Sequence, residues 1–339
     1  MDEPHLPLGK LPADLLAALL RRHAPDDPRV LLGPGVGEDA AVIDMGDRCL
    51  VAKTDPITFA TDEIGRYAVN VNANDVACCG ARPRWFLATL LLPESGSDAD
   101  SVAAIFEQMD AACASLGVTL CGGHTEITHG LDRPIVVGQM LAEVARDAYV
   151  SGAGARAGDA VILTKGIALE GTAIIAREKP ALLEAFMDEA TRARCAGFLT
   201  RPGISVVEDA HVALAAGEVH ALHDPTEGGL ATGLRELAAA AGLGLHVERE
   251  RIPVLPECDL VCRRLGLEPL GLIASGSLLI AAARDDAGAI VDALAAAGIA
   301  SSVIGRLLEP GEGLRLARAD GRLEPLPSFA RDELARLFE

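Results

Sequence analysis

Short stretches that combine glycines with carboxylates recur along this chain. The first is GPGVGED, in which Gly35 and Gly37 precede Glu38 and Asp39. Alternating glycines let backbone N–H groups approach an anion closely, and adjacent carboxylates can coordinate a divalent cation; a plain surface turn is the alternative. No Lys-Ser or Lys-Thr pair follows, which excludes a Walker A loop. The stretch precedes a predicted strand instead of opening a helix, which excludes a dinucleotide-binding fingerprint.

Two further motifs place polar side chains at the ends or in the middle of apolar elements. Thr54 and Asp55 end a predicted strand, where Asp55 either serves a site or caps the next turn. Asn74 and Asp75 interrupt a predicted helix of small residues. A buried carboxylate at Asp75 would need a cation or hydrogen-bond donors, whereas solvent exposure is the alternative.

The remaining motifs each follow a predicted strand. CGGHTE contains Gly122, Gly123, His124, Thr125 and Glu126, a combination that suits phosphate or metal contact, although a lone histidine is more often structural.

HDPTEGG places Asp224, Thr226 and Glu227 at the start of a predicted helix, whose free N–H groups attract anions. Asp224 or Thr226 could also cap that helix. Lys165 could neutralise phosphate charge or be a solvated lysine. Carboxylates from several strand ends suit a magnesium-bound triphosphate.

Alternating strands and helices must position these motifs. Apolar periodicity predicts helices over residues 12–23, 62–79, 97–116, 180–198, 227–241 and 285–297. It predicts strands over 40–43, 49–57, 84–92, 118–121, 133–144, 160–164, 220–223, 277–283 and, as the last strand, 300–305. The glycine-rich stretch 151–159 is the best linker. The sequence therefore predicts two domains, residues 1–150 and 151–339.

Composition narrows the class of partner. The 339 residues are 50% hydrophobic and 23% charged, as in globular proteins. The net charge of −19 and the aromatic content of 3% argue against a nucleic-acid partner. The apolar runs are too short to span a bilayer, and no signal-peptide pattern opens the chain. We therefore expect no membrane partner, a cytoplasmic location, and buried reduced thiols for the eight cysteines.

In order and spacing, the segments GVGEDAAV, TDP, NDVACCGARPRW, GGHTE and DPTEGGLA resemble the PurM-like (AIR synthase-related) superfamily over residues 30–310. The second half is most similar to the HypE-like branch, which works in hydrogenase maturation, and GARPRW is also similar to thiamine-monophosphate kinases. The resemblance implies an α+β, two-domain PurM-like fold. Its N-terminal α/β domain would form a β-barrel in a homodimer, and an ATP site would lie between that domain and a C-terminal α+β domain.

The resemblance also implies roles for the motif residues. The implied magnesium ligands are Glu38, Asp39, Asp55, Asp75, Glu126 and Asp224. The implied ATP contacts are Gly35, Gly37, Thr54, Asn74, Gly122, Gly123, His124, Thr125, Lys165, Thr226 and Glu227. His124 stands where kinase and HypE-like relatives carry aspartate, which leaves either His124 or Glu126 as a metal ligand. No residue is singled out as catalytic.

The C-terminus departs from the HypE pattern. HypE proteins end in a cysteine that receives a carbamoyl group, whereas the last cysteine here is Cys262; we therefore expect that the cyanide-delivering reaction does not run here as the family runs it. Selenophosphate synthetase is disfavoured because no cysteine precedes Gly33.

Three functions follow from this pattern. The first is an ATP- and Mg²⁺-dependent enzyme, of ligase/dehydratase or kinase type, that phosphorylates an oxygen of an unidentified small-molecule or protein acceptor and releases ADP. The second is a thiamine-monophosphate-kinase-like phosphotransferase. The third is a non-catalytic ATP-binding maturation or assembly factor.

Overall fold

The computed structural model describes residues 6, 9–58 and 60–338. Contacts within the chain define two compact units. Residues 39–149 join 27–32 in the first, called here the N-terminal unit. The chain from residue 150 onward joins 33–38 and the described part of 1–26 in the second, the C-terminal unit. Both units are therefore discontinuous in sequence.

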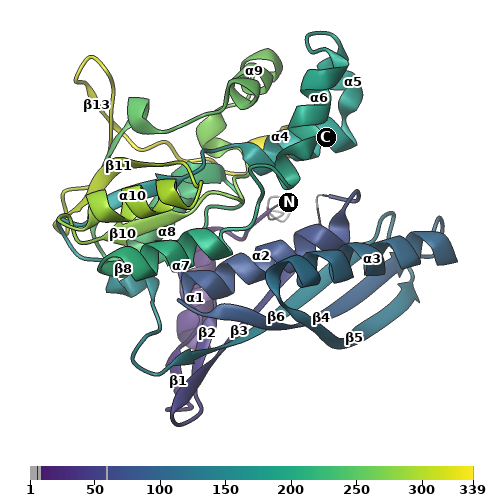
Figure 1. The fold of residues 1–339 in the computed structure, drawn as a ribbon, viewed down its shortest axis with the longest axis horizontal. Coiled ribbons are helices and arrows are strands. Elements are labelled where there is room, and N and C mark those ends of the chain that lie inside the picture. The colour runs from purple at the N-terminus through teal and green to yellow at the C-terminus, as the bar shows by residue number, and fades with distance from the viewer. Residues whose placement is uncertain (1–5, 7–8, 59, 339) are drawn as a thin grey trace, which may run out of the picture. The chain divides into compact units, whose positions relative to one another are not determined.

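The N-terminal unit is a six-stranded sheet with two helices along one face (Figure 1). Its strands lie in the order β1 (Val30–Leu32), β2 (Ala41–Asp44), β3 (Arg48–Ile57), β6 (Ile135–Ala145), β4 (Arg82–Pro93) and β5 (Thr119–Thr128). Neighbouring strands are antiparallel except β4 and β5, which are parallel. A parallel pair needs a crossover connection, and α3 (Ala99–Leu116) provides it.

Helix α2 (Ile64–Cys78) is buried along almost its whole length, since it packs on the sheet and on α3. Small residues make this close packing feasible. At Gly65 an added Cβ would stand 2.5 Å from the Ile105 carbonyl oxygen of α3. Helix α3 begins at a capping box, in which Asp98 and Ser101 accept each other's backbone N–H at 2.8 and 3.0 Å.

The C-terminal unit is built on a seven-stranded sheet (Figure 1). Its strands lie in the order β13 (Leu323–Pro325), β12 (Leu314–Ala317), β9 (Gly244–Glu248), β11 (Ser301–Leu308), β7 (Ala160–Thr164), β10 (Leu279–Ala282) and β8 (Val219–His223). Leucines of α8 (Gly229–Ala241) share one core with Val161 and Leu163 of β7. Helices α7 (Val207–Ala216) and α10 (Ala287–Ala296) pack together, and α10 also contacts β7 and β11. The remaining helices are α1 (Ala13–Arg22), α4 (Leu169–Glu178), α5 (Pro180–Glu184), α6 (Glu189–Ala196) and α9 (Pro256–Leu265).

The α+β, two-domain architecture predicted from the sequence is confirmed, but several elements differ. The helix predicted over 180–198 is two helices, α5 and α6, because the Asp188 side chain accepts the Thr191 N–H at 2.7 Å and starts α6. The strand predicted to end at 121 continues to Thr128 as β5, and β12 and β13 follow the strand expected to be last. The sequence interpretation missed α4, α7, α9 and β9, whose apolar runs are short and interrupted.

Two further expectations concern the burial of the cysteines and the absence of a membrane-spanning helix. Seven of the cysteines are buried, whereas Cys121 on β5 is exposed, which corrects the expectation for that thiol. Across residues 9–58 and 60–338, no helix combines the length and the apolar character needed to cross a membrane.

The close approach of α2 and α3 predicts the effect of substitution at Gly65. We expect Gly65→Ala to lower the free energy of unfolding by about 1–3 kcal/mol, because the added methyl group must push the Ile105 carbonyl away. Urea unfolding monitored by circular dichroism measures the change. Gly288→Ala in α10 is the control: its Cβ meets nothing within 4 Å, so it should raise stability by up to about 1 kcal/mol. Equal effects at both positions would contradict this packing.

Candidate functional site

Two carboxylates of the N-terminal unit converge on one ammonium group. The Lys53 Nζ lies 3.3 Å from an Asp55 oxygen and 3.3 Å from an Asp75 oxygen. Lys53 and Asp55 are two residues apart on β3 and therefore share a face of the strand, while Asp75 reaches them from α2. Asp75 is 4% exposed. The structure thus brings Asp55 and Asp75, two predicted metal ligands, to the same positively charged group, the Lys53 ammonium.

The backbone at Asp55 is fixed by an asparagine that the sequence interpretation did not select. Asn72, fully buried on α2, accepts the Asp55 N–H at 2.8 Å and donates to the Asp55 carbonyl at 3.2 Å. Its amide also donates to the Ala68 carbonyl at 2.8 Å. Thr54 donates its hydroxyl to the Gly138 carbonyl of β6 at 2.9 Å. These contacts hold Asp55 in register with α2.

Two other predicted residues lie in the same unit. Asp39 has a carboxylate oxygen within 4.8 Å of the buried Cys78 Sγ at the end of α2. Asn74 is fully buried one residue before Asp75. Their roles in metal and nucleotide binding stay predictions.

The CGGHTE motif is not a loop at a strand end, as the sequence predicted, but part of β5 itself. His124 and Glu126 project from the same face of this strand, with Nε2 and Oε2 3.1 Å apart, and their side chains are 65% and 47% exposed. Gly123 has φ +149°, and a Cβ there would stand 1.9 Å from the Ala88 carbonyl oxygen of β4. That glycine is therefore required by the approach of two strands. Contacts of Gly122, Thr125 and Glu126 with a ligand stay predictions.

In the C-terminal unit, a half-buried carboxylate on α8 lies beside the end of β8. Glu236 is 3.1 Å from the Nε2 of His223, and the Lys10 ammonium lies 3.4 Å from its other oxygen. Burial alone would raise the pKa of Glu236, but the His223 hydrogen bond and the charge of Lys10 outweigh it and lower that pKa to about 2. Asp224 follows His223 directly and is 2% exposed.

The glycine-rich segment packs on the same helix. Gly37 has φ +82°, and a Cβ there would stand 2.5 Å from the Glu236 carbonyl oxygen. The Glu38 carboxylate accepts the backbone N–H groups of Gly152 and Ala153 at 3.1 and 3.2 Å. Gly35 precedes this contact in the same segment. The structure gives Glu38 two backbone donors, and its role as a metal ligand stays a prediction.

The segment 224–229 turns sharply into α8. The Thr226 backbone carbonyl accepts the Gly229 N–H at 3.0 Å, and Gly228 and Gly229 have φ values of +79° and +63°. Thr226 and Glu227 are partly exposed here. Only glycine adopts two consecutive left-handed conformations at low cost, which explains the GG pair.

Two carboxyls beside this turn escaped the sequence interpretation. Burial raises the pKa of Glu170 on α4 to about 7, and the charges of Asp332 and Glu227 add to that rise. Burial also raises the pKa of Asp332 to about 6, although three backbone N–H groups counteract it. Shifts of this kind cluster at functional sites. No local motif marks either residue.

Lys165 is not the solvated lysine that the sequence left as one alternative. Its side chain is 7% exposed, and its ammonium lies 3.0 Å from Asp209 and 2.6 Å from the Ser205 carbonyl. Burial lowers the pKa of Lys165, and Asp209 counteracts this. Because the ammonium is buried and already bound, these contacts do not support the expected neutralisation of phosphates.

Known proteins match the chain over most of its length. The family model for the AIR synthase related protein, N-terminal domain, matches residues 37–144, and the model for the C-terminal domain matches residues 156–316. The carbamoyl dehydratase HypE of Cupriavidus necator is 32% identical over 287 residues, which cover 81% of this chain and 78% of that protein.

Solved structures agree with these matches. A hydrogenase maturation protein HypE in complex with ATP is 26% identical, with a TM-score of 0.71, over 95% of this chain and 96% of that one. A thiamine monophosphate kinase from Aquifex aeolicus has a TM-score of 0.67 over 92% of this chain and 98% of that one. At 19% identity, the second likeness shows the fold alone.

The lowered pKa of Glu236 predicts acid sensitivity. Its ionised form contributes stability above its unfolded pKa of about 4.5, and this contribution is lost as pH falls toward about 2. We therefore expect Glu236→Gln to lower the free energy of unfolding by about 1–3 kcal/mol at pH 7 and by much less at pH 2.5. Urea titrations at both pH values measure the difference.

The control for this substitution is Glu184→Gln, at an exposed position on α5. It should leave the free energy of unfolding nearly unchanged at both pH values. An equal loss for the Glu236 variant at pH 7 and pH 2.5 would show that packing, and not charge, accounts for the effect.

Proposed function

This chain belongs to the AIR synthase-related family, in its HypE-type branch, and we propose that it binds ATP with Mg²⁺ and uses it to activate a carbamoyl-type oxygen by phosphorylation. The family membership sets the class of reaction. The proposal is assigned to particular residues because Asp55 and Asp75 both lie 3.3 Å from the Lys53 ammonium.

The residues of the N-terminal unit fit a magnesium ion. Mg²⁺ takes oxygen ligands, commonly one or two carboxylates with phosphates and waters. Asp55 and Asp75 offer such oxygens, each 3.3 Å from the Lys53 ammonium. Asn72 holds the Asp55 backbone, so the position from which that carboxylate extends is fixed before any ligand arrives. Bound there, Mg²⁺ would neutralise charge on the nucleotide phosphates.

The C-terminal unit contributes a helix N-terminus. The positive end of the α8 dipole favours negative charge, and it does so although the Gly228 and Gly229 N–H groups are bonded to Asp332 and Thr226. Asp224, Thr226 and Glu227 precede that start on a turn fixed by Gly228 and Gly229. In this proposal the turn binds nucleotide phosphates, and Asp224 is the candidate metal ligand of the C-terminal unit.

The proposed chemistry balances on a carbamoyl group carried by a separate acceptor, since the sequence offers no C-terminal cysteine to carry it as HypE proteins do. The carbamoyl oxygen attacks the terminal phosphorus of ATP, the bond to ADP breaks, and the oxygen becomes a phosphate ester. Cleavage of the C–O bond then releases inorganic phosphate while two protons leave the nitrogen, so a carbon–nitrogen triple bond forms. The name carbamoyl dehydratase borne by the 32%-identical relative supports this class of product.

The two other candidate functions have weaker support. The likeness to thiamine monophosphate kinase is one of fold. A non-catalytic assembly factor would bind ATP without forming ADP. Assays of ADP release with ATP alone, with thiamine monophosphate, and with a carbamoylated protein separate the three, and mass spectrometry of the products identifies the acceptor.

The magnesium role of Asp75 is open to direct test. We expect Asp75→Asn to reduce Mg²⁺-dependent ADP formation by about a hundredfold, because one charged oxygen that holds the metal is lost. Raising the Mg²⁺ concentration should restore part of the activity. A coupled assay of ADP release across a Mg²⁺ titration measures both effects.

Asp110→Asn, on the exposed side of α3, is the matched control and should leave the activity unchanged. Full activity of the Asp75 variant at the same Mg²⁺ concentration would rule out the metal role of that side chain.

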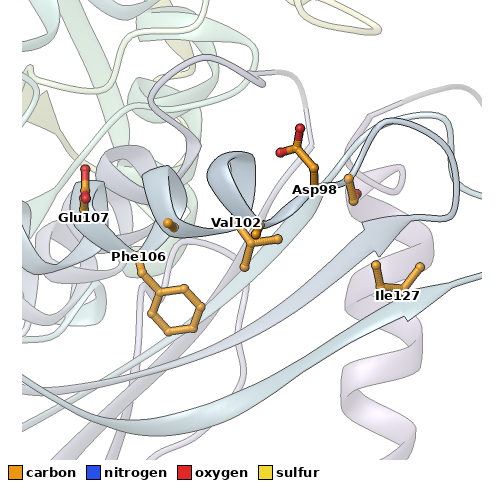
Figure 2. A pocket seen from close by; sticks show the side chains of 8 residues that line it. Asp98, Val102, Phe106, Glu107 and Ile127 are labelled. Atoms are coloured by element: carbon orange, nitrogen blue, oxygen red, sulfur yellow. The ribbon is translucent and has the colours of Figure 1, made fainter.

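We also propose that the chain forms a homodimer through β5. Among the described strands, β5 pairs with β4 alone, and its residues are exposed along most of its length. Figure 2 shows the groove beside it, where Val102 and Phe106 of α3 approach Ile127 of β5. Phe106 is 42% exposed and Ile127 57%. An edge strand beside an apolar groove is typical of an association surface.

The dimer proposal predicts that Ile127→Asp yields a monomer, because a charge would then lie in the apolar contact. Size-exclusion chromatography with light scattering measures the mass. Leu323→Asp is the control, since Leu323 is 58% exposed and lies on β13 at an edge of the other sheet. A wild-type monomer at micromolar concentration, or a dimeric Ile127 variant, would argue against β5 as the interface.

A further inference from the structure

The C-terminal residues 326–338 form a segment that docks on the C-terminal unit. Leu326, Leu334 and Ala335 are buried. Arg235 of α8 donates to the Pro327 carbonyl at 3.1 Å and also to the carbonyl of Leu326. The C-terminal segment therefore contacts α8, the helix whose N-terminus follows Asp224 in the proposed phosphate-facing turn.

Contacts with other parts of the C-terminal unit also anchor the C-terminal segment. Glu333 accepts the Glu268 N–H at 2.9 Å and pairs with Arg336 at 2.7 Å. The Phe338 ring lies 4.8 Å from the Lys179 ammonium. Docking of the segment as a whole thus rests on several independent contacts.

Asp332 makes a different kind of contact, because it reaches the turn itself. One carboxylate oxygen accepts the Gly228 N–H at 2.6 Å. The other accepts the N–H of Leu334 at 2.8 Å and that of Ile273 at 3.2 Å. Asp332 is 7% exposed, so these three donors replace the water that a carboxylate would otherwise bind.

The Gly228 N–H is the donor that matters for the turn. Gly228 and Gly229 both adopt left-handed conformations, and a glycine pair has many alternative conformations open to it. A Cβ at Gly229 would stand 2.6 Å from the Leu270 carbonyl oxygen, so the turn is packed tightly on residues 270–272. One short charge-assisted bond from the C-terminal segment selects one conformation of this pair.

From these contacts we propose that Asp332 is a positioning residue, whose carboxylate holds the Gly228 N–H and thereby fixes the turn 224–229 for binding the phosphates of MgATP. This inference rests on the proposed function, because it assumes that the turn faces phosphates. Asp332 acts through Gly228 and touches no ligand itself.

A carboxylate at position 332 is electrostatically unfavourable, because other acidic groups lie near it. Glu227 faces it from the turn and Glu170 from α4, and both are acidic. Like charges in a buried setting oppose one another. A residue that served only to pack the C-terminal segment would not need a negative charge in this place, whereas an acceptor for three convergent N–H groups does.

Asp332→Asn tests the inference selectively. An amide offers one acceptor oxygen and one donor group. One oxygen of Asp332 accepts two N–H groups, those of Leu334 and Ile273, whereas the other accepts only that of Gly228. The amide oxygen should therefore stay with Leu334 and Ile273, and its NH₂ should face the Gly228 N–H. We expect the KM for MgATP in the ADP-release assay to rise about tenfold while kcat changes much less.

Glu333→Gln is the matched control, because it loosens the C-terminal segment one residue away without touching Gly228. Its KM for MgATP should equal that of the wild type. Equal increases in KM for the two variants would overturn the inference, since they would trace the effect to docking of the segment. An unchanged KM in the Asp332 variant would overturn it as well.

Amide hydrogen exchange supplies a readout that needs neither activity nor the variant. In the wild-type protein the Gly228 amide should exchange at least about tenfold more slowly than the exposed turn amides around it, and fast exchange would overturn the contact. If the wild type protects Gly228 yet fails to bind MgATP, the proposed function fails, and the role of Asp332 in nucleotide binding fails with it while the contact itself stands.

Discussion

Burying a carboxylate is the constraint on which the arrangement of both units depends. An ionised group without a partner costs several kcal/mol in the interior, so each buried acid dictates where its partners must be. Asp75 is held by the Lys53 ammonium, Glu236 by His223 and Lys10, and Asp332 by backbone N–H groups. In each case at least one partner belongs to another element of the fold, and the contact ties the two elements together.

The parts of the site that sequence could predict are those governed by local pattern. Asp55 and Asp75 were selected because polar residues interrupt apolar elements, and the structure brings them to one cation. Lys53 could also have been predicted to lie near Asp55, since residues two positions apart on a strand share one face. The sequence likewise predicts a helix start at the Gly228–Gly229 pair, and α8 begins at Gly229.

The rest depends on tertiary contacts that no local pattern encodes. Gly122 and Gly123 looked like a phosphate loop, but the close approach of β4 and β5 requires Gly123. Lys165 looked like a free cation, although Asp209 from α7 pairs with it. Asp332 lies in an ordinary surface-like sequence, and only the fold brings Gly228 to it across 104 positions. Such residues become visible only when burial and donors are known.

Charge also decides how this chain would hold an anion. Its net charge is −19, but at physiological salt the screening length is about 8 Å, so only nearby carboxylates matter. The turn before α8 carries Asp224 and Glu227, and the one lysine expected to help, Lys165, is bound to Asp209. A helix N-terminus contributes only about half a positive charge. If the proposed function holds, phosphates at this turn meet like charges unless a divalent metal turns these carboxylates into ligands, so we expect nucleotide binding itself, and not only catalysis, to depend on magnesium.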